Sequence, residues 1–306
     1  MLDVLAQLPL RIEDSSIERL ARRGATGGIR RTTLVRLRGD GHEGQGEDVT
    51  FQTADALTTA SGLAALCDVR TLGDAWCRLE RLQLFPRPPE HAVVRSYRRW
   101  AVEAAALDLA LRQAGLAFGE RVGRAPGPVR FVVSPGRAHL RRFPNARLKL
   151  DAGHLEPGLP VDIVDFKGSG DSRLVGHVLE LYPEALLEDP PIVVAGARNS
   201  WDIGIHSFDD ILRLSERPAA VNVKPARLGS VAELLELYEG CARAGIALYG
   251  GGQDELGPGR AQIQLLAALF HPDAPNDVAP GGYNDAEPPS QLPGSPLAVT
   301  PGPGFR

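Results

Sequence analysis

The sequence predicts an α/β protein whose C-terminal half is a parallel sheet or a barrel. From about residue 127, short apolar runs alternate with polar turns and helical patterns, which is typical of parallel strands joined by crossover helices. Three runs stop at charged side chains, at residues 186–189 (LLED), 199–202 (NSWD) and 221–225 (VNVKP). Because the carboxyl ends of barrel strands meet on one face, we expect these charged groups to lie together there.

Length and composition are those of an ordinary globular protein. The 306 residues are 43% hydrophobic and 24% charged, with a formal net charge of −4, and such a chain can form one large core or two domains. The sequence has no basic run that would indicate a nucleic-acid partner. It also lacks an 18-residue apolar stretch, and its start, MLDVLAQLPL, has no cationic segment. We therefore expect neither a membrane partner nor a secretory signal.

Cysteines and histidines do not suggest a metal site. Cys67, Cys77 and Cys241 are scattered without metal-type spacing. Because their number is odd, we expect buried, unpaired thiols in a reducing compartment, and hence a cytoplasmic protein. His206 and His271 lack a partner at metal-ligand spacing, and both are expected to be structural.

The N-terminal third is expected to begin with a hairpin. Residues 32–38 and 47–53 have extended patterns separated by turn-forming residues. Residues 22–31 (RRGATGGIRR) are glycine-rich and basic, and two interpretations stay open: a solvated loop, or a mobile flap that contacts an acidic substrate. The flap would act through Arg22, Arg23, Arg30 and Arg31.

Helical patterns follow the hairpin. Residues 54–84 have helical apolar spacing that is interrupted at 68–73. Residues 98–113 have the broadest apolar face, and Gly115 stands where a C-terminal cap is expected. We expect this second helix to pack in the core.

The candidate strands of the C-terminal half are residues 129–133, 147–150, 161–166, 185–188, 191–195, 219–223 and 246–249. Two of the intervening helices have N-terminal cap signals, Ser207 with Asp210 and Ser230 with Glu233. The last 36 residues contain nine prolines and are expected to form an ordered but irregular tail over the surface.

The charged residues at the strand ends suggest a metal site with a base beside it. Asp165, Glu188 and Asp202 each close a predicted strand, and three carboxylates offer the oxygen ligands that Mg²⁺ prefers. Lys224 ends a fourth strand, and Lys149 lies in the predicted strand 147–150. A lysine beside a divalent ion has its pKa lowered toward that of a general base. A divalent ion on a substrate carboxylate would stabilise the enolate that forms when an α-proton is removed.

Each acidic residue also has an ordinary structural interpretation. Asp165 beside Lys167 could lie in a surface turn, and Glu188 in a loop. Asp202 could be an acid at a helix N-terminus. The recurrence of charged residues at four strand ends favours the metal site over these alternatives.

Several segments together resemble a known family, the enolase superfamily, and most closely its mandelate racemase and muconate lactonizing enzyme branch. VNVKPARLG and GGGQDELG are the most specific of them. The segments are GHEGQGEDV (41–49), WAVEAAALDLALRQAG (100–115), LKLD (148–151), LLEDP (186–190), WDIGIHS (201–207), VNVKPARLGSV (221–231), YGGGQDELGPGR (249–260) and PLAVTPGPGFR (296–306).

The resemblance implies an α+β capping domain, residues 1–125 joined by the tail 285–306, and a modified (β/α)7β TIM-type barrel, residues 126–284. Spacing predicts that this barrel is truncated. Only 15 residues separate Lys149 from Asp165, and 13 separate Glu188 from Asp202. A crossover with its helix needs at least about 10 to 12 residues besides the strands, so one or two outer helices are expected to be missing.

The resemblance also implies the site residues. Asp165, Glu188 and Asp202 are similar to the ligands of Mg²⁺, for which Mn²⁺ can substitute. Lys149 matches the second lysine of the family's K-x-K motif and Lys224 the sixth-strand lysine, a pair that exchanges an α-proton from opposite faces of the substrate. The superfamily is itself the established example of lysine bases working with Mg²⁺.

Two residues depart from the family's pattern. Arg147 replaces the first lysine of K-x-K, where it cannot act as a base but could keep an electrostatic role. Lys167 replaces the asparagine of D-x-N, so a cation lies two residues from a predicted ligand. We assign both to the substrate-binding residues, with Gln253 and Glu255 near the end of the seventh strand.

These inferences lead to two hypotheses. The first is a Mg²⁺-dependent isomerase or lyase that abstracts the α-proton of a small carboxylate to give a metal-stabilised enolate, followed by racemisation or epimerisation, elimination or cycloisomerisation. The second is a non-catalytic homologue with a ligand-binding or structural role, in which Lys167 occupies the metal position. Barrels of this kind often form symmetric assemblies, so a homo-oligomer is also expected.

Overall fold

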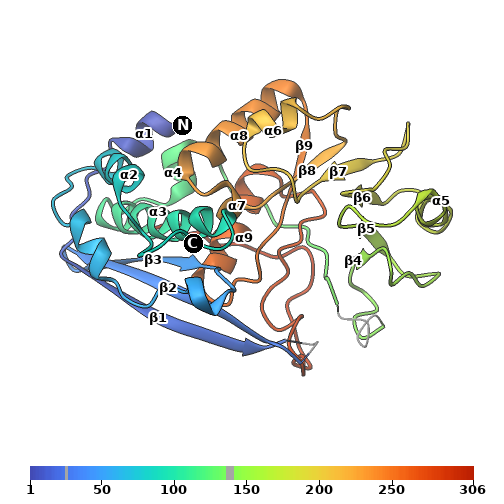
Figure 1. The fold of residues 1–306 in the computed structure, drawn as a ribbon, viewed down its shortest axis with the longest axis horizontal. Coiled ribbons are helices and arrows are strands. Elements are labelled where there is room, and N and C mark those ends of the chain that lie inside the picture. Colours follow the sequence, from blue (N-terminus) through green and yellow to red (C-terminus); the bar gives the residue numbers. More distant parts are fainter. Residues whose placement is uncertain (25–26, 136–140) are drawn as a thin grey trace.

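The computed structural model describes residues 1–24, 27–135 and 141–306. An antiparallel sheet with helices, blue to green in Figure 1, precedes a parallel sheet that runs from β4 to β9. The elements of the first part are α1 (Leu2–Ala6), β1 (Asp14–Arg23), β2 (Ile29–Gly39), β3 (His42–Asp48), η1 (Thr53–Asp55), η2 (Ser61–Leu66), α2 (Leu72–Arg81), α3 (Val93–Gln113) and α4 (Phe118–Val122).

The predicted hairpin is formed by β2 and β3. The two strands pair around a tight turn at Asp40 and Gly41, whose φ angles are both positive, 48° and 74°. β3 begins and ends earlier than the pattern at 47–53 indicated, because residues 42–46, which were expected to form the turn, belong to the strand, and residues 49–53 do not. Its early end has a local reason, because the Asp48 side chain accepts a hydrogen bond from the backbone N–H of Thr50 at 2.9 Å and turns the chain away from the ladder.

β1 is a third strand that the sequence patterns missed. Its last residues pair with the first residues of β2, so that Arg22 lies opposite Arg30. Residues 22–23 and 29–31 are therefore strand, which neither the solvated loop nor the mobile flap anticipated, and residues 25–26 lie outside the described residues. Arg22 and Arg23 thus lie at the end of β1, and Ile29, Arg30 and Arg31 at the start of β2 (Figure 1).

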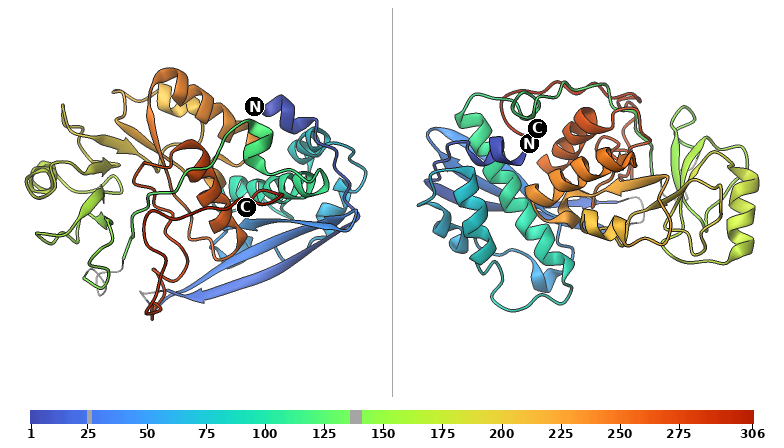
Figure 2. Two further views of the ribbon diagram at one scale, coloured as in Figure 1. Left: turned by 180° about the vertical axis from the view of Figure 1, so that it is seen from behind. Right: turned by 90° about the horizontal axis from the view of Figure 1, so that it is seen from above.

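α3 confirms the clearest helix prediction. Gly115 follows its end with a φ of 67°, as expected for a C-terminal cap. The helix crosses β3 at very short range because that strand carries glycines. A Cβ on Gly46 would lie 1.9 Å from the carbonyl oxygen of Ala101, and one on Gly44 would also collide with α3. The two elements thus anchor the N-terminal core (Figure 2).

The parallel strands follow one another in sequence order: β4 (Leu148–Asp151), β5 (Val161–Asp165), β6 (Leu186–Glu188), β7 (Asn199–Trp201), β8 (Ala220–Val223) and β9 (Ala247–Gly250). Two further segments close the ring, since Val133 forms a parallel bridge with β4 and Gly251, next to β9, forms one with Asp277. A third parallel bridge joins Phe131 to Asn276. We call residues 129–133 and 276–277 the seam of this barrel.

Crossover helices are fewer than in a complete barrel, as the spacing predicted. Those present are α5 (Ser172–Leu181), α6 (Phe208–Leu212), α7 (Pro225–Leu228), α8 (Val231–Ala244) and α9 (Pro258–Phe270). Residues 152–160 and 189–198, all of them described, contain no helix. The strand expected at 191–195 is wrong, because Pro190 and Pro191 supply no N–H donor for a sheet ladder.

Helix starts and other local predictions had mixed outcomes. Ser207 and Ser230 cap α6 and α8, as predicted. Only residues 72–81 of the expected helical region 54–84 form an α-helix. Cys241 is buried, but Cys67 and Cys77 are exposed, so the expectation of three buried thiols is wrong.

The C-terminal tail returns to the N-terminal helices. Phe305 is fully buried, with ring centroids 4.9 Å from Phe118 and 6.1 Å from Trp100. Leu297 forms a bridge with Val129 of the seam. Among the described residues, no helix combines the length and apolar character needed to cross a bilayer. The division into domains at residues 125 and 285 stays a prediction.

Candidate active site

The charged residues predicted at the strand ends lie at one end of the barrel. Asp165 and Glu188 are the last residues of β5 and β6 and pair with each other in the parallel register. Asp202 directly follows β7, and Lys224 lies between β8 and α7. The side chain of Lys149, on β4, reaches Glu188 at this end of the barrel. The parallel arrangement therefore brings five predicted residues together.

Lys149 lies at the centre of an acidic cluster. Its Nζ atom is 2.5 Å from Glu188 Oε1, 3.4 Å from Asp277 Oδ2 and 3.6 Å from Asp165 Oδ2, and 8% of its side chain is exposed. Burial alone would lower the pKa of Lys149, but the neighbouring carboxylates outweigh burial and hold that pKa well above its ordinary value. The side chain therefore carries a positive charge while these contacts are in place.

Glu188 is completely buried. Its Oε2 atom accepts hydrogen bonds from Asn222 Nδ2 at 3.1 Å and from the hydroxyl group of Tyr249, while Oε1 faces Lys149. Burial raises the pKa of Glu188, and the ammonium group opposes that rise. Burial and the adjacent carboxylate also raise the pKa of Tyr249, so its phenol keeps the proton that it donates.

Lys167 pairs with Asp165 from the solvent side. Its Nζ atom is 2.9 Å from Asp165 Oδ2 and also bonds to Asp151, and its backbone N–H donates to Asp165 Oδ1 at 3.0 Å. Burial lowers the pKa of Lys167, but its two carboxylate partners outweigh that effect and raise it. Because 53% of the side chain is exposed, Lys167 remains at the rim rather than among the buried carboxylates.

Asp202 is held by two cations. Its Oδ2 atom accepts from Lys224 Nζ at 2.7 Å and its Oδ1 atom from Arg227 Nη1 at 2.6 Å. Burial would raise the pKa of Asp202, but these cations lower it. Asp189 fixes the same strand end, because its carboxylate accepts from the backbone N–H groups of Asp202 at 2.9 Å and of Ile203 at 3.0 Å.

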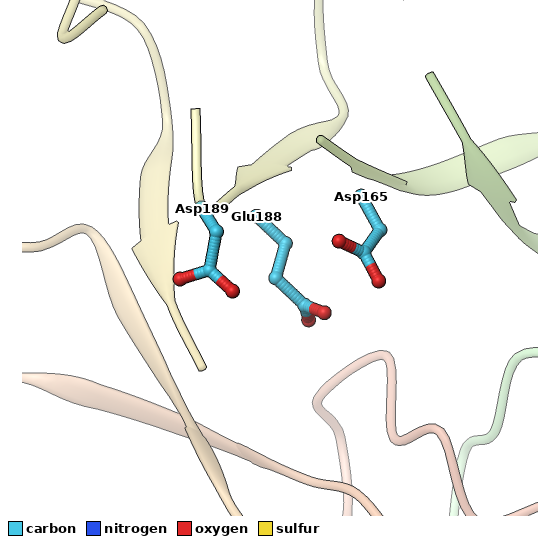
Figure 3. A group of neighbouring side chains, drawn as sticks. All are labelled: Asp165, Glu188 and Asp189. Atoms are coloured by element: carbon cyan, nitrogen blue, oxygen red, sulfur yellow. The ribbon is translucent and has the colours of Figure 1, made fainter. Parts of the chain in front are cut away.

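Three carboxylates are close enough to share a metal ion. Oxygen atoms of Asp165, Glu188 and Asp189 lie within 4.8 Å of one another (Figure 3). Carboxylate oxygens are hard donors that suit Mg²⁺ and Mn²⁺, so this donor set fits a divalent cation. The set predicted from the sequence has Asp202 in place of Asp189, and Asp165 and Glu188 belong to both.

A cavity of about 250 Å³ opens at this end of the barrel, and its lining includes Lys149, Asp165, Lys167, Lys224, Gln253 and Asp277. The chain has only three lysines among its 34 basic residues, and all three line this cavity. A larger cavity of about 470 Å³, which includes Arg22 and Glu255, shares four lining residues with it. The two cavities therefore adjoin, and together they offer room for a small molecule with an extended substituent.

Two family models match parts of the chain. Residues 3–121 match the family model described as "Domain of unknown function (DUF8230) N-terminal domain", and residues 160–285 match the corresponding C-terminal domain. Two curated proteins are similar over shorter segments. An N-succinylamino acid racemase of Amycolatopsis sp is 37% identical over 88 residues, and the o-succinylbenzoate synthase of Bacillus subtilis (strain 168) is 34% identical over 80 residues. These alignments cover 28% and 26% of this chain, and 24% and 22% of the relatives.

Solved structures are similar over nearly the whole chain. The muconate lactonizing enzyme from Pseudomonas putida superposes with a TM-score of 0.74 at 19% identity, over 96% of both chains. A mandelate racemase/muconate lactonizing protein from Herpetosiphon aurantiacus has a TM-score of 0.72 at 19% identity, over 97% of this chain and 98% of its own. The chain has the fold of the enolase superfamily. The fold predicted from the sequence, a truncated barrel of this superfamily with an N-terminal α+β part, is thus confirmed.

Within the enolase-superfamily fold, one predicted substrate contact, Arg147, lies outside both cavities. Arg147 was assigned to substrate binding two residues before Lys149, but it precedes β4, and the register shifts between Leu148 and Lys149. This irregularity breaks the alternation of side chains. Arg147 is half-exposed, pairs with Asp162, and lines neither cavity.

The basic hairpin is also tied down rather than free. Arg30 donates to the carbonyl oxygens of Val49 and Gln253, each at 2.7 Å, and to that of Asp254 at 3.2 Å. Arg22 pairs with Asp285 of the tail at 3.5 Å. These two guanidinium groups therefore serve the contact between the hairpin and the barrel loops.

Several site residues were missed by the sequence analysis, namely Asp151, Asp189, Asn222, Arg227, Tyr249 and Asp277. Asn222 and Arg227 lie inside the VNVKPARLG segment, whose motif was the signal that could have identified them. Asp277 follows a proline-containing loop and lacks any such signal.

Proposed function

We propose that this chain is an enzyme that abstracts the α-proton of a small carboxylate substrate. The observation that carries the proposal is that Lys149 and Lys224, which approach from opposite ends of the strand row β4 to β8, line one cavity with Asp165. The names of similar proteins support this reaction class, because they include racemases and lactonizing enzymes.

A divalent cation, Mg²⁺ or Mn²⁺, would be held by Asp165 and Glu188. Asp202 is the third ligand that the sequence predicts, and Asp189 is the alternative third carboxylate within reach. When bound, such a cation supplies positive charge that stabilises the negative charge of the substrate as the α-proton leaves. Asn222 and Tyr249 would keep Glu188 oriented by their hydrogen bonds to its Oε2 atom.

The two lysines are proposed to move the proton. One amine takes it from the α-carbon, and the other delivers a proton to the opposite face, which yields racemisation or epimerisation. Elimination follows instead if the second lysine protonates a leaving group. Cycloisomerisation follows if the leaving group is the ring oxygen of a lactone, so that the ring opens; in the reverse direction a substrate carboxylate adds to the double bond and a lysine protonates the α-carbon. The proposed class is therefore an isomerase or a lyase.

The adjoining cavity is proposed to hold the rest of the substrate. Gln253 lines the first cavity and Glu255 the second, so both are candidates for contacts to a polar substituent. Both curated relatives carry names of succinyl compounds. Succinylated carboxylates are therefore the first class to screen.

A non-catalytic ligand-binding role is the second candidate. It is favoured by one observation: Lys149, Lys167 and Lys224 already neutralise the carboxylates that would otherwise bind a cation. A cytoplasmic location and a homo-oligomeric state stay predictions under either function.

The test measures exchange of the α-proton in D₂O, with Mg²⁺ and a panel of N-succinyl amino acids. The readout is the loss of the α-proton signal in ¹H NMR. Exchange by the parent is expected to fall about 10²- to 10⁴-fold in Lys224→Met. The control Arg213→Met removes an exposed cation directly after α6 that lines neither cavity, and is expected to retain exchange. A parent chain that exchanges none of the panel, even after Mg²⁺ binding has been established, would favour the non-catalytic role.

A further inference from the structure

Lys149 supplies the positive charge within the buried carboxylate cluster. Its ammonium group contacts acidic residues from three separate elements: Asp165 of β5, Glu188 of β6 and Asp277 of the seam. The shortest contact, 2.5 Å, is to Glu188 Oε1. A cation that needs this oxygen would therefore have to displace the ammonium group.

The remaining oxygen of Glu188 offers no alternative. Oε2 already accepts from the amide of Asn222 and the hydroxyl group of Tyr249, and Glu188 has no exposed surface. Both donors come from strands of the sheet, β8 and β9, so their positions are set by the barrel itself. Only Oε1 is available for exchange of partners.

Asp277 gives the ammonium group a second place to bind. Its carboxylate lies 3.4 Å from Lys149 Nζ on the side of the cavity. It is held there by a hydrogen bond of 2.9 Å from Ser134 Oγ, and its backbone N–H donates to Gly250 O at 2.7 Å. The flexible stem of a lysine allows Nζ to move from Glu188 to this fixed carboxylate without a change in the backbone.

We propose that Lys149 and a divalent cation compete for Glu188, and that Asp277 holds the ammonium group when the cation is bound. The inference rests on the proposed function in that it requires Asp165 and Glu188 to bind a cation. It assigns the competing role for Glu188 to Lys149 rather than to Lys167, which is half-exposed and, among the described residues, forms its ion pairs with Asp151 and Asp165.

The affinity test uses Mn²⁺ and electron paramagnetic resonance. If the ammonium group holds Glu188 in about 90 to 99% of molecules, Lys149→Met should tighten the apparent Mn²⁺ affinity about 10- to 100-fold. Lys167→Met frees Asp165 but leaves Lys149 on Glu188, so it should tighten the affinity less than Lys149→Met does. The control Arg213→Met removes an exposed cation outside the cluster and should change the affinity less than about threefold. Asp277→Asn should weaken binding in the parent and do so less in the Lys149→Met background, because the second anchor then has nothing to hold.

A second readout follows the lysine itself. With only three lysines in the chain, protein labelled with [¹³Cε]lysine should give three resonances, assigned by the Lys149→Met and Lys167→Met variants. Addition of Mg²⁺ to the parent should shift the Lys149 resonance most. If Lys149→Met is too unstable without metal, the parent and Asp277→Asn still provide this measurement, since Asp277 is partly exposed.

The outcomes separate the inference from the proposed function. Equal Mn²⁺ affinity of the parent and Lys149→Met, with binding lost in Glu188→Gln, overturns the inference and leaves the metal site standing. Binding by Lys149→Met but not by the parent supports the inference and removes metal-dependent catalysis. Absence of binding in both overturns both, because the carboxylates then form no cation site at all.

Discussion

Lowering the pH from 7 to 4 is expected to destabilise this protein through one buried histidine, His271, at the end of α9. Its Nδ1 atom lies 2.6 Å from Asn276 Oδ1 and its Nε2 atom 3.2 Å from the hydroxyl group of Tyr238. The amide of Asn276 donates to three carbonyl oxygens, so its Oδ1 atom must accept and His271 Nδ1 must carry the proton. Nε2 then accepts from Tyr238, and the ring is neutral.

Burial sets the magnitude of this effect. Removal from water lowers the pKa of His271 from 6.5 to about 4, although the hydrogen bond to Asn276 opposes the change. The unfolded chain therefore binds a proton in a range where the folded chain does not, and stability falls as the pH drops from about 6.5 to about 4. At about 1.4 kcal/mol per pKa unit, the loss approaches about 3 kcal/mol.

The assay compares the parent with His271→Gln, which retains hydrogen-bonding groups but cannot titrate in this range. Urea unfolding, followed by fluorescence of the three tryptophans, gives the free energy of unfolding at each pH. Because carboxylates titrate in both proteins, only the difference between the two curves reports His271. That difference should change by about 3 kcal/mol between pH 7 and pH 4. Parallel curves would refute a neutral, buried His271.

Three further substitutions test the packing and the support of the site. Phe305→Ala should lower the free energy of unfolding by about 3–5 kcal/mol, and a loss below about 1 kcal/mol in urea titrations would mean that the tail is not packed as described. Gly46→Ala places a Cβ 1.9 Å from the carbonyl oxygen of Ala101, so soluble protein with an unchanged melting temperature would contradict the close approach of α3. Asp189→Asn replaces an acceptor of two backbone N–H groups and should lower the free energy of unfolding by about 1–3 kcal/mol. Equal urea midpoints of the parent and this variant would argue against the role of Asp189 in fixing Asp202.

The strand-end residues were predictable because parallel strands obey a simple rule. Each short apolar run stops at a charged residue, and the carboxyl ends of parallel strands lie on one side. Asp165, Glu188 and Lys224 could therefore be grouped without knowledge of any distance. Arg147 was assigned instead by its place in the family motif, and the irregularity in the register after Leu148, which sets it apart from Lys149, is invisible in the letters of the sequence.

The partners of these residues could not be predicted in the same way. Tyr249 belongs to an apolar run, and its hydroxyl group reaches Glu188 only because β9 closes against β8 in a particular register. Asp277 lies between prolines in a stretch that has the composition of a loop. Its contact with Lys149 depends on ring closure, which no local pattern encodes.

The seam has a consequence for how the protein loses its site. It joins residues that are far apart along the chain, such as Phe131 and Asn276, through single bridges. The six regular strands, in contrast, pair with sequential neighbours. Sub-global opening is expected to begin where pairing is sparsest. Separation of the seam would carry Asp277 away from Lys149 while Asp165 and Glu188 stay paired, so that the site can come apart before the sheet unfolds.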